Sequence, residues 1–332
     1  LPIYQSDRSL DLELFLLVRP FQVNPYYQFL NTTGGTGKIN SLEEEAPGLI
    51  AVDDKVIMTS RKCDAFGASV SDEGNIVDMI RKGKMPPGRS ATDLSGMANG
   101  VIRYDIHLQP GEQTELFAAV PYHGRKSYTG NQGNTEISDG FYTEADFDDS
   151  EIPEDFYRAA DFWRAKTDHI RFRLPASADR IIETWKSNLV YILINRDNVG
   201  IQPGSRSYER SWIRDGALTS SALLKSGIVP EVRDFIDWYA AHQFENGKVP
   251  CVVDFRGPDP VPENDSHGEL IYLIREYFNF TRDTAFLRSK NDNVLRAVDY
   301  IESLITERSG EHFRDGNDSI RAYYGLVPES IS

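Results

Sequence analysis

Residues 211–218 carry the sequence SWIRDGAL, in which Trp212, Arg214 and Asp215 lead directly into an apolar helix. Turn-forming polar residues precede this stretch, and apolar residues recur behind it at helical spacing. Asp215 is therefore expected near a helix N-terminus, where unpaired backbone N–H groups and the helix dipole favour a carboxylate. Taken alone, the motif has a structural explanation, in which Asp215 caps the helix, Arg214 forms a surface ion pair and Trp212 fills the core.

A second polar segment, VPENDSHGE, begins at residue 261 and again precedes an apolar helix. It contributes Glu263, Asp265 and His267 as candidate site residues, and Arg210 stands just before the first stretch. Carboxylates, arginine and histidine beside an aromatic ring suit a pocket that hydrogen-bonds the hydroxyl groups of a sugar while the ring covers its C–H surface. For His267, a structural role in pairing with a neighbouring carboxylate is the alternative.

The composition is that of an acidic globular protein. The chain has 332 residues, a formal net charge of -15 and two cysteines, Cys63 and Cys251. This length predicts two domains. The charge argues against nucleic acid as a partner, and no apolar run is long enough to indicate a membrane span. The cysteines lack metal-ligand spacing, so we expect no metal site. No cofactor is expected either.

The N-terminal half has the patterning of β-strands, with alternating apolar and polar residues from residue 10 to about residue 124. Two hairpins are predicted. One spans residues 49–58 with its turn at Asp53, and the other spans residues 101–120 with its turn at Pro110. We therefore predict an antiparallel β-sandwich domain over residues 1–152.

The C-terminal half has the periodicity of helices. Residues 153–176 are predicted as a linker helix and residues 177–332 as a helical domain, in which five amphipathic helices, one of them behind Asp215, occupy residues 178–306. Trp185 and Trp238 are both assigned to the core. The other four helices carry these apolar stripes: Ile181, Trp185, Leu189 and Ile192; Val232, Phe235, Ile236 and Tyr239; Leu270, Leu273, Ile274 and Tyr277; Val294, Val298, Ile301 and Ile305.

The connections between these helices differ in length. The long ones are the first, third and fifth, at residues 197–211, 245–265 and 307–332. In a stack of antiparallel helix pairs, alternate connections fall at the same end. We therefore predict that one end of the helical domain collects Trp212, Arg214, Asp215, Glu263 and Asp265, together with residues beyond position 308.

At this point the sequence resembles the six-hairpin glycosidases, and it is most similar to the glucoamylase family and its bacterial relatives. The match is carried by residues 211–217 and, through Asp265, by residues 262–268. The resemblance implies an N-terminal supersandwich followed by part of an (α/α)6 toroid, truncated because five helices fall short of six pairs. It also implies that Arg214 and Asp215 bind hydroxyl groups of the sugar whose bond is cut.

The same resemblance implies an inverting glycoside hydrolase that cleaves an O-glycosidic bond, expected to be α-glucosidic, in an oligo- or polysaccharide. The family's proton donor follows the fifth helix, where Glu329 stands, and its general base would lie beyond Ser332. On local chemistry alone Glu263 is also a candidate acid, because neighbouring carboxylates raise a pKa, although a substrate contact is the preferred interpretation. Two alternatives stay open: a phosphorylase, favoured by Arg206, Arg210 and Arg214, and a non-catalytic carbohydrate-binding fragment.

Overall fold

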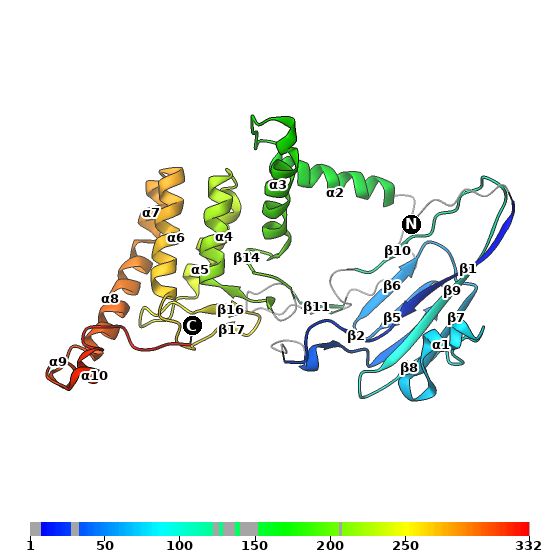
Figure 1. The fold of residues 1–332 in the computed structure, drawn as a ribbon, viewed down its shortest axis with the longest axis horizontal. Coiled ribbons are helices and arrows are strands. Elements are labelled where there is room, and N and C mark those ends of the chain that lie inside the picture. Colours follow the sequence, from blue (N-terminus) through cyan, green and yellow to red (C-terminus); the bar gives the residue numbers. More distant parts are fainter. Residues whose placement is uncertain are drawn as a thin grey trace. The chain divides into compact units, whose positions relative to one another are not determined.

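The computed structural model describes residues 8–27, 33–121, 126–128, 137–139, 152–205 and 208–331. The chain divides into two compact units (Figure 1). The first comprises Leu1–Thr129 and Thr135–Tyr157, and the second comprises Gly130–Asn134 and Arg158–Ser332. The described part of the first unit is built mainly from antiparallel strands, and that of the second mainly from helices.

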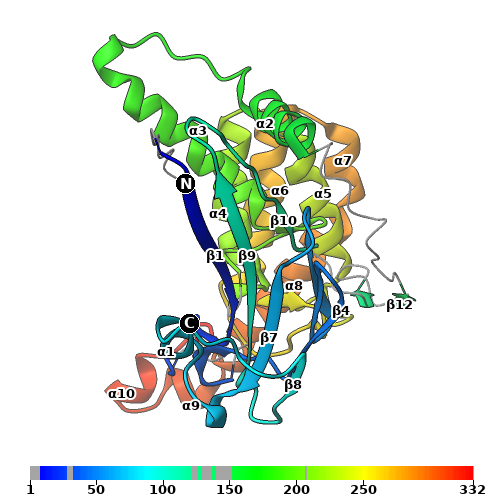
Figure 2. The same cartoon turned by 90° about the vertical axis from the view of Figure 1, so that its right-hand side faces the viewer.

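Two antiparallel sheets form most of the first unit. Figure 2 shows β1, β9 and β7 of the smaller sheet side by side. In order across it, the smaller sheet contains β1 (Leu10–Val18), β9 (Ala98–Leu108) and β7 (Ala65–Val70). The larger sheet contains β10 (Ala118–Ala119), β6 (Lys55–Thr59), β5 (Leu49–Val52), β4 (Ser41–Ala46) and β8 (Ser90–Thr92). The shorter elements are β2 (Phe21–Gln22) paired with β3 (Thr36–Gly37), α1 (Ile76–Arg81), and β11 (Lys126–Tyr128) paired with β12 (Ile137–Asp139).

One of the two predicted hairpins is present and the other is wrong. β5 and β6 pair around Asp53, which adopts a left-handed φ of 51° in the turn. The predicted pairing across Pro110 does not form, because β9 pairs with β1 and β7 while β10 pairs with β6 in the other sheet. β9 and β1 are paired continuously from Leu10↔Leu108 to Val18↔Gly100, a much longer ladder than the short strand β10 can offer.

The two sheets share a buried core. Ile50 of β5 belongs to the same cluster as Ile102 and Tyr104 of β9, and all three side chains are fully buried. Gly100 of β9 lies against Leu42 of β4 so closely that an added Cβ would stand 2.3 Å from the leucine Cδ1. A larger residue at position 100 would therefore push the sheets apart.

Helices of the second unit enclose the larger core. α4 packs against α5 and α6, and α6 packs against α8. The helices are α2 (Ile152–Thr167, which begins in the first unit), α3 (Asp179–Ile194), α4 (Ile213–Lys225), α5 (Pro230–Ala241), α6 (Ser266–Thr281), α7 (Thr284–Ser289), α8 (Asn291–Glu307), α9 (Glu311–Arg314) and α10 (Asp318–Arg321). Short strands join them: β13 (Arg196–Asp197) pairs with β14 (Gly200–Ile201), and β15 (Ser211–Trp212), β16 (Val252–Asp254) and β17 (Gly257–Pro258) form a small sheet. No helix in the described part of the chain has both the length and the apolar character needed to span a membrane.

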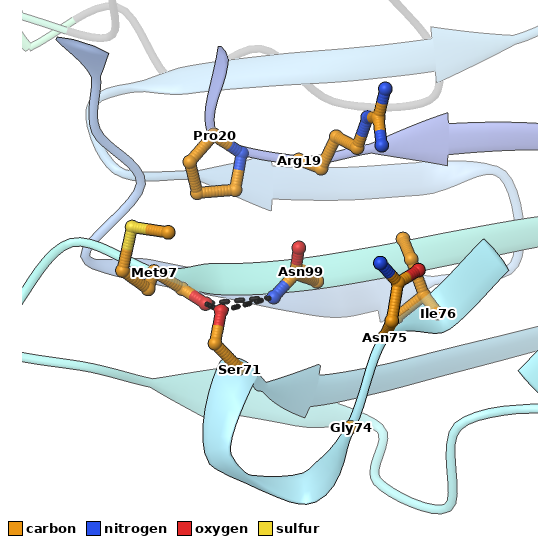
Figure 3. A pocket seen from close by; sticks show the side chains of 8 residues that line it. All are labelled: Arg19, Pro20, Ser71, Gly74, Asn75, Ile76, Met97 and Asn99. Carbon is orange, nitrogen blue, oxygen red and sulfur yellow. Dashed lines mark hydrogen bonds between the residues drawn. The ribbon is translucent and has the colours of Figure 1, made fainter. Parts of the chain in front are cut away.

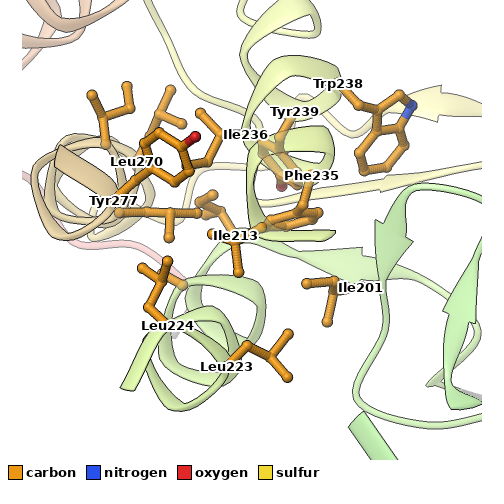
Figure 4. Close-up of a cluster of buried hydrophobic side chains, with 14 of the residues drawn as sticks. Ile201, Ile213, Leu223, Leu224, Phe235, Ile236, Trp238, Tyr239, Leu270 and Tyr277 are labelled. Carbon is orange, nitrogen blue, oxygen red and sulfur yellow. The ribbon is translucent and has the colours of Figure 1, made fainter. Parts of the chain in front are cut away.

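The predicted apolar stripes of α5 and α6 form the centre of this core (Figure 4). Phe235 of α5 and Leu270 of α6 have no exposed surface, and Gly216 of α4 approaches Phe235 so closely that a Cβ there would lie 2.2 Å from the ring. The prediction for Trp238 is confirmed, since its side chain is buried. The prediction for Trp185 is wrong, because this residue of α3 is 45% exposed.

Helices α3 and α8 bury less of their predicted stripes than α5 and α6 do. On α3 the buried residues are Leu189 and Leu193, whereas Ile181 is 67% exposed. On α8 the buried positions are Ala297 and Leu304, which lie beside the predicted stripe. Periodicity thus located the helices, but it assigned the buried face correctly on α5 and α6 and only in part on α3 and α8.

Candidate functional site

Arg214 joins the N-terminal ends of α4 and α6. It is the second residue of α4, and its Nη1 donates to Asp265 Oδ2 at 2.6 Å and to Glu263 Oε2 at 3.4 Å. Asp265 is the N-cap residue of α6, while Trp212 is the N-cap of α4, so Asp215 lies in the first turn and does not cap the helix. We call Arg214, Asp215, Glu263 and Asp265 the Arg214 cluster.

The segment that follows α8 reaches the same end of the helices. Asn264 Nδ2 donates to the Pro328 carbonyl at 2.8 Å, and the Ile331 N–H donates to the Pro262 carbonyl at 3.2 Å. Glu329, between them in sequence, forms an ion pair with Arg308. The third and fifth long connections therefore meet at this end of the helices, and the first joins the third where Ser211 pairs with Val253.

The two candidate acids have opposite environments. Glu263 is 8% exposed, and burial raises its pKa, helped by Asp265 and Asp215 and opposed by the Arg214 guanidinium. The side chain of Glu329 is 68% exposed, and its hydrogen bond from Arg308 lowers its pKa. Of the two candidate acids, Glu263 has the raised pKa and Glu329 the lowered one.

Arg210 has partners that the sequence did not indicate. Its Nε donates to Asp254 Oδ2 at 2.7 Å and its Nη2 to Asp259 Oδ2 at 2.9 Å. Arg256 also bonds Asp254, which is 3% exposed. We call these two arginines and two aspartates the Arg210 cluster. Arg210 was predicted to contact substrate, but its guanidinium is engaged with carboxylates of the protein itself.

His267 has no exposed surface, and its predicted contact with a sugar stays a prediction that this burial does not favour. Its Nδ1 accepts a hydrogen bond from the Val249 N–H at 3.1 Å, which leaves the proton of the neutral ring on Nε2. The ring meets Tyr300 edge to face, with 4.7 Å between centroids. Burial lowers the pKa of His267 to about 4. His267 lies in the first turn of α6, and among the described residues no hydrogen bond or ion pair joins it to a carboxylate, unlike what the alternative supposed.

Comparison with known proteins gives a match in structure. No family model and no curated protein sequence matches the chain. Among solved structures, the chain is similar to the crystal structure of a bacterial glucoamylase complexed with acarbose, with a TM-score of 0.54 and 11% sequence identity. In fold, the chain resembles a bacterial glucoamylase. The alignment covers 92% of this chain and 45% of the glucoamylase, so the chain spans less than half the length of that protein.

A pocket of about 250 Å³ in the first unit was not predicted (Figure 3). Ser71 Oγ and Asn99 Nδ2 both donate to the Met97 carbonyl on its floor, at 3.0 and 2.7 Å. The lining residues are Arg19, Pro20, Ser71, Gly74, Asn75, Ile76, Met97 and Asn99. This lining includes no carboxylate, so it offers no acid and base pair. Across the described ranges, no group of three or more His, Cys, Asp and Glu residues is arranged to hold a metal.

Sequence reasoning missed Asp254 and Asp259, the carboxylates that bind Arg210. A signal was present, since Asp254 ends an apolar run and precedes the turn residues Phe255, Arg256 and Gly257. A buried strand that ends in a carboxylate indicates a cationic partner nearby. The partner, more than forty residues earlier in the chain, could not be identified from the sequence.

Proposed function

We propose that the chain is part of a glycoside hydrolase and that the Arg214 cluster binds the sugar whose bond is cut. The observation that carries this proposal is the Arg214 guanidinium, bonded to both Glu263 and Asp265 where two helices begin, in a chain with a glucoamylase-like fold. Residues 1–152 would correspond to a supersandwich domain, residues 153–176 to a linker, and residues 177–332 to the first helices of an (α/α)6 toroid.

The chemistry requires a carboxylic acid that protonates the leaving oxygen and a second carboxylate that activates water. Glu263 suits the first role, because burial and two neighbouring carboxylates favour its protonated form. Glu329 is the other candidate for this role as proton donor, supported by its position after α8. To act as an acid it would have to leave Arg308, because that ion pair stabilises the ionised form.

The remaining residues of the cluster would bind the sugar. Trp212 is partly exposed and would cover the C–H face of a pyranose ring. Arg214, Asp215 and Asp265 would bind its hydroxyl groups, with Arg214 exchanging part of its hydrogen bonding from Asp265 to the ligand. An α-glucosidic oligosaccharide is the proposed substrate, in line with the acarbose bound by the similar glucoamylase. Cleavage would proceed with inversion.

A phosphorylase is less well supported by the described residues. Arg214 is bonded to Asp265 and Glu263, and Arg210 to Asp254 and Asp259, so both cations already face carboxylates. A phosphate would be repelled by the same groups. Arg206, the third arginine of that hypothesis, lies outside the described residues.

The test combines binding and turnover. Calorimetry with acarbose measures binding to the 332-residue chain, and product analysis with maltooligosaccharides, with and without phosphate, measures turnover. Free glucose supports the hydrolase, and a sugar phosphate would favour the phosphorylase. Binding without turnover would favour a carbohydrate-binding role. If wild type and Arg214→Ala both fail to bind acarbose, the sugar site is refuted.

The proton donor is then identified by two matched substitutions, Glu263→Gln and Glu329→Gln. Each removes one titrating carboxyl group and keeps the volume of the side chain. If Glu263 is the donor, Glu263→Gln abolishes the alkaline limb of the pH–rate profile while Glu329→Gln retains it. The reverse result would assign the role to Glu329.

A further inference from the structure

Arg210 and Trp212 stand two residues apart at the entrance to α4. Trp212 lies in β15, where it pairs with Val252, and Arg210 immediately precedes that strand. Side chains two residues apart on an extended segment project from the same face. The guanidinium carbon of Arg210 accordingly lies 5.3 Å from the centroid of the Trp212 ring, within the range of a cation–π contact.

The guanidinium is itself held in place. Asp254 and Asp259 bind two different nitrogens of Arg210, whose side chain is only 12% exposed. Asp254 also accepts from the backbone N–H of Arg256 at 2.9 Å, which ties it to the β16–β17 hairpin. Two carboxylates on one planar group fix both its position and its orientation.

The ring of Tyr208 also lies beside the Trp212 indole. The Tyr208 and Trp212 centroids are 6.2 Å apart, with the rings inclined at 51°. The Trp212 indole therefore contacts Arg210 and lies near Tyr208, and part of its surface stays exposed. An exposed indole would otherwise move among several side-chain conformers, and a ligand would have to immobilise it on binding.

We propose that Arg210 is a positioning residue that fixes the plane of the Trp212 indole for stacking on a sugar ring, and that it does not contact the sugar. The identity of the ligand rests on the proposed function, whereas the order of the indole is a property of the protein alone. Asp254 and Asp259 support this role by holding the guanidinium. Affinity for the sugar then depends on Arg210 through the conformational freedom of Trp212.

The test uses Arg210→Met, Arg210→Lys and a matched control, Arg256→Met. Arg256 bonds the same Asp254, but its guanidinium carbon lies over Phe255, at 5.5 Å from that ring. Acrylamide quenching without sugar reports on Trp212, as the difference between each protein and its Trp212→Phe counterpart. We expect faster quenching of Trp212 in Arg210→Met, an intermediate rate in Arg210→Lys and no change in Arg256→Met.

Calorimetry on the same proteins measures the effect on binding. Arg210→Met should weaken acarbose binding about three- to tenfold, the range expected for immobilising one extra side chain. Arg210→Lys should restore part of the affinity, and Arg256→Met should bind like wild type. If Arg210→Met does not fold, as judged by circular dichroism, Arg210→Lys provides both readouts, because it keeps the charge and lacks the planar fork.

The outcomes separate this proposal from the proposed function. Unchanged quenching of Trp212 in the Arg210 variants would overturn the positioning role, and so would equal effects of Arg210→Met and Arg256→Met. Faster quenching in the Arg210 variants, combined with no binding of acarbose by wild type, would uphold the positioning role and overturn the sugar ligand.

Discussion

The Arg214 and Arg210 clusters use the same chemical groups with different results. The Arg214 cluster has one cation beside three carboxyl groups, and both Arg214 and Asp265 are about one-third exposed. The Arg210 cluster has two cations for two carboxylates, and its central Asp254 is buried. One cluster has more acid groups than one arginine can neutralise, whereas the other is balanced.

Burial and the neighbouring charges together shift the pKa values of the carboxyl groups in the two clusters. In the Arg214 cluster, burial and the neighbouring carboxylates raise the pKa of Glu263. In the Arg210 cluster, burial opposes ionisation of Asp254, but hydrogen bonds from Arg256 and Arg210 outweigh it and lower the pKa. The Arg214 cluster thus favours the protonated form of Glu263, whereas the Arg210 cluster favours the ionised form of Asp254.

The largest expected effect is on catalysis. Glu263→Gln should lower kcat about 10²- to 10⁴-fold, because a positioned general acid contributes that much. Stability at neutral pH should not fall. A carboxyl group with a raised folded-state pKa stabilises the fold below its unfolded pKa and loses that contribution as pH rises. Urea denaturation at pH 7 checks this, and a clear loss of stability would show that Glu263 belongs with the structural cluster.

Removing the centre of the balanced cluster should affect stability most. Asp254→Ala leaves Arg210 partly buried with one carboxylate, and breaking a buried ion pair costs about 3–5 kcal/mol. Urea denaturation at pH 7 measures the change. A loss below about 1 kcal/mol, the range of surface pairs, would contradict the assignment of this cluster to structure.

As pH falls, protonation of His267 in the first turn of α6 should lower stability before protonation of Asp254 in the Arg210 cluster does. His267 has a folded-state pKa of about 4 against 6.5 as its ordinary value, so it stabilises the fold above pH 6.5. That contribution, about 3 kcal/mol, is lost as pH falls from 6.5 to 4. Stability of His267→Gln should vary less over this interval, as followed by urea denaturation. His312→Gln, at an exposed position, should retain the wild-type pH dependence; equal behaviour of the two variants would refute the assignment.

The smallest effect is expected at the exposed pair. Asp265→Ala removes the strongest hydrogen bond of Arg214, yet both side chains reach solvent, so the loss of stability should stay within about 1 kcal/mol. Binding of acarbose should weaken if Asp265 holds a hydroxyl group. Thermal unfolding and calorimetry together distinguish this result from a structural role, in which stability would fall without a change in affinity.

Much of the fold could be predicted because local patterns agree with packing. The apolar stripes of α5 and α6 and the hairpin at Asp53 follow from periodicity and turn chemistry. The pairing of β9 with β1 could not, because strands about ninety residues apart compete with a nearer partner and the longer ladder prevails. Exposure of Trp185 likewise depends on which elements pack against α3.

The sequence predicted which residues gather at the candidate site, but it did not predict their burial or their ion pairs. The order of long and short connections placed Arg214, Glu263 and Asp265 at one end of the helices, and hydrogen bonds join them there. The sequence did not distinguish Glu263 from Glu329, and it did not show that His267 is buried. The roles of all these residues in binding and catalysis stay predictions.

The sequence by itself determined the helices, the β-rich half and the residue types that gather where the helices begin, because these depend on periodicity and on the order of connections. Only the tertiary structure decided which carboxyl groups have a raised pKa and which arginine is already bonded to carboxylates. Those properties depend on burial and on charges brought together from distant segments, as Arg210 meets Asp254 and Arg214 meets Asp265.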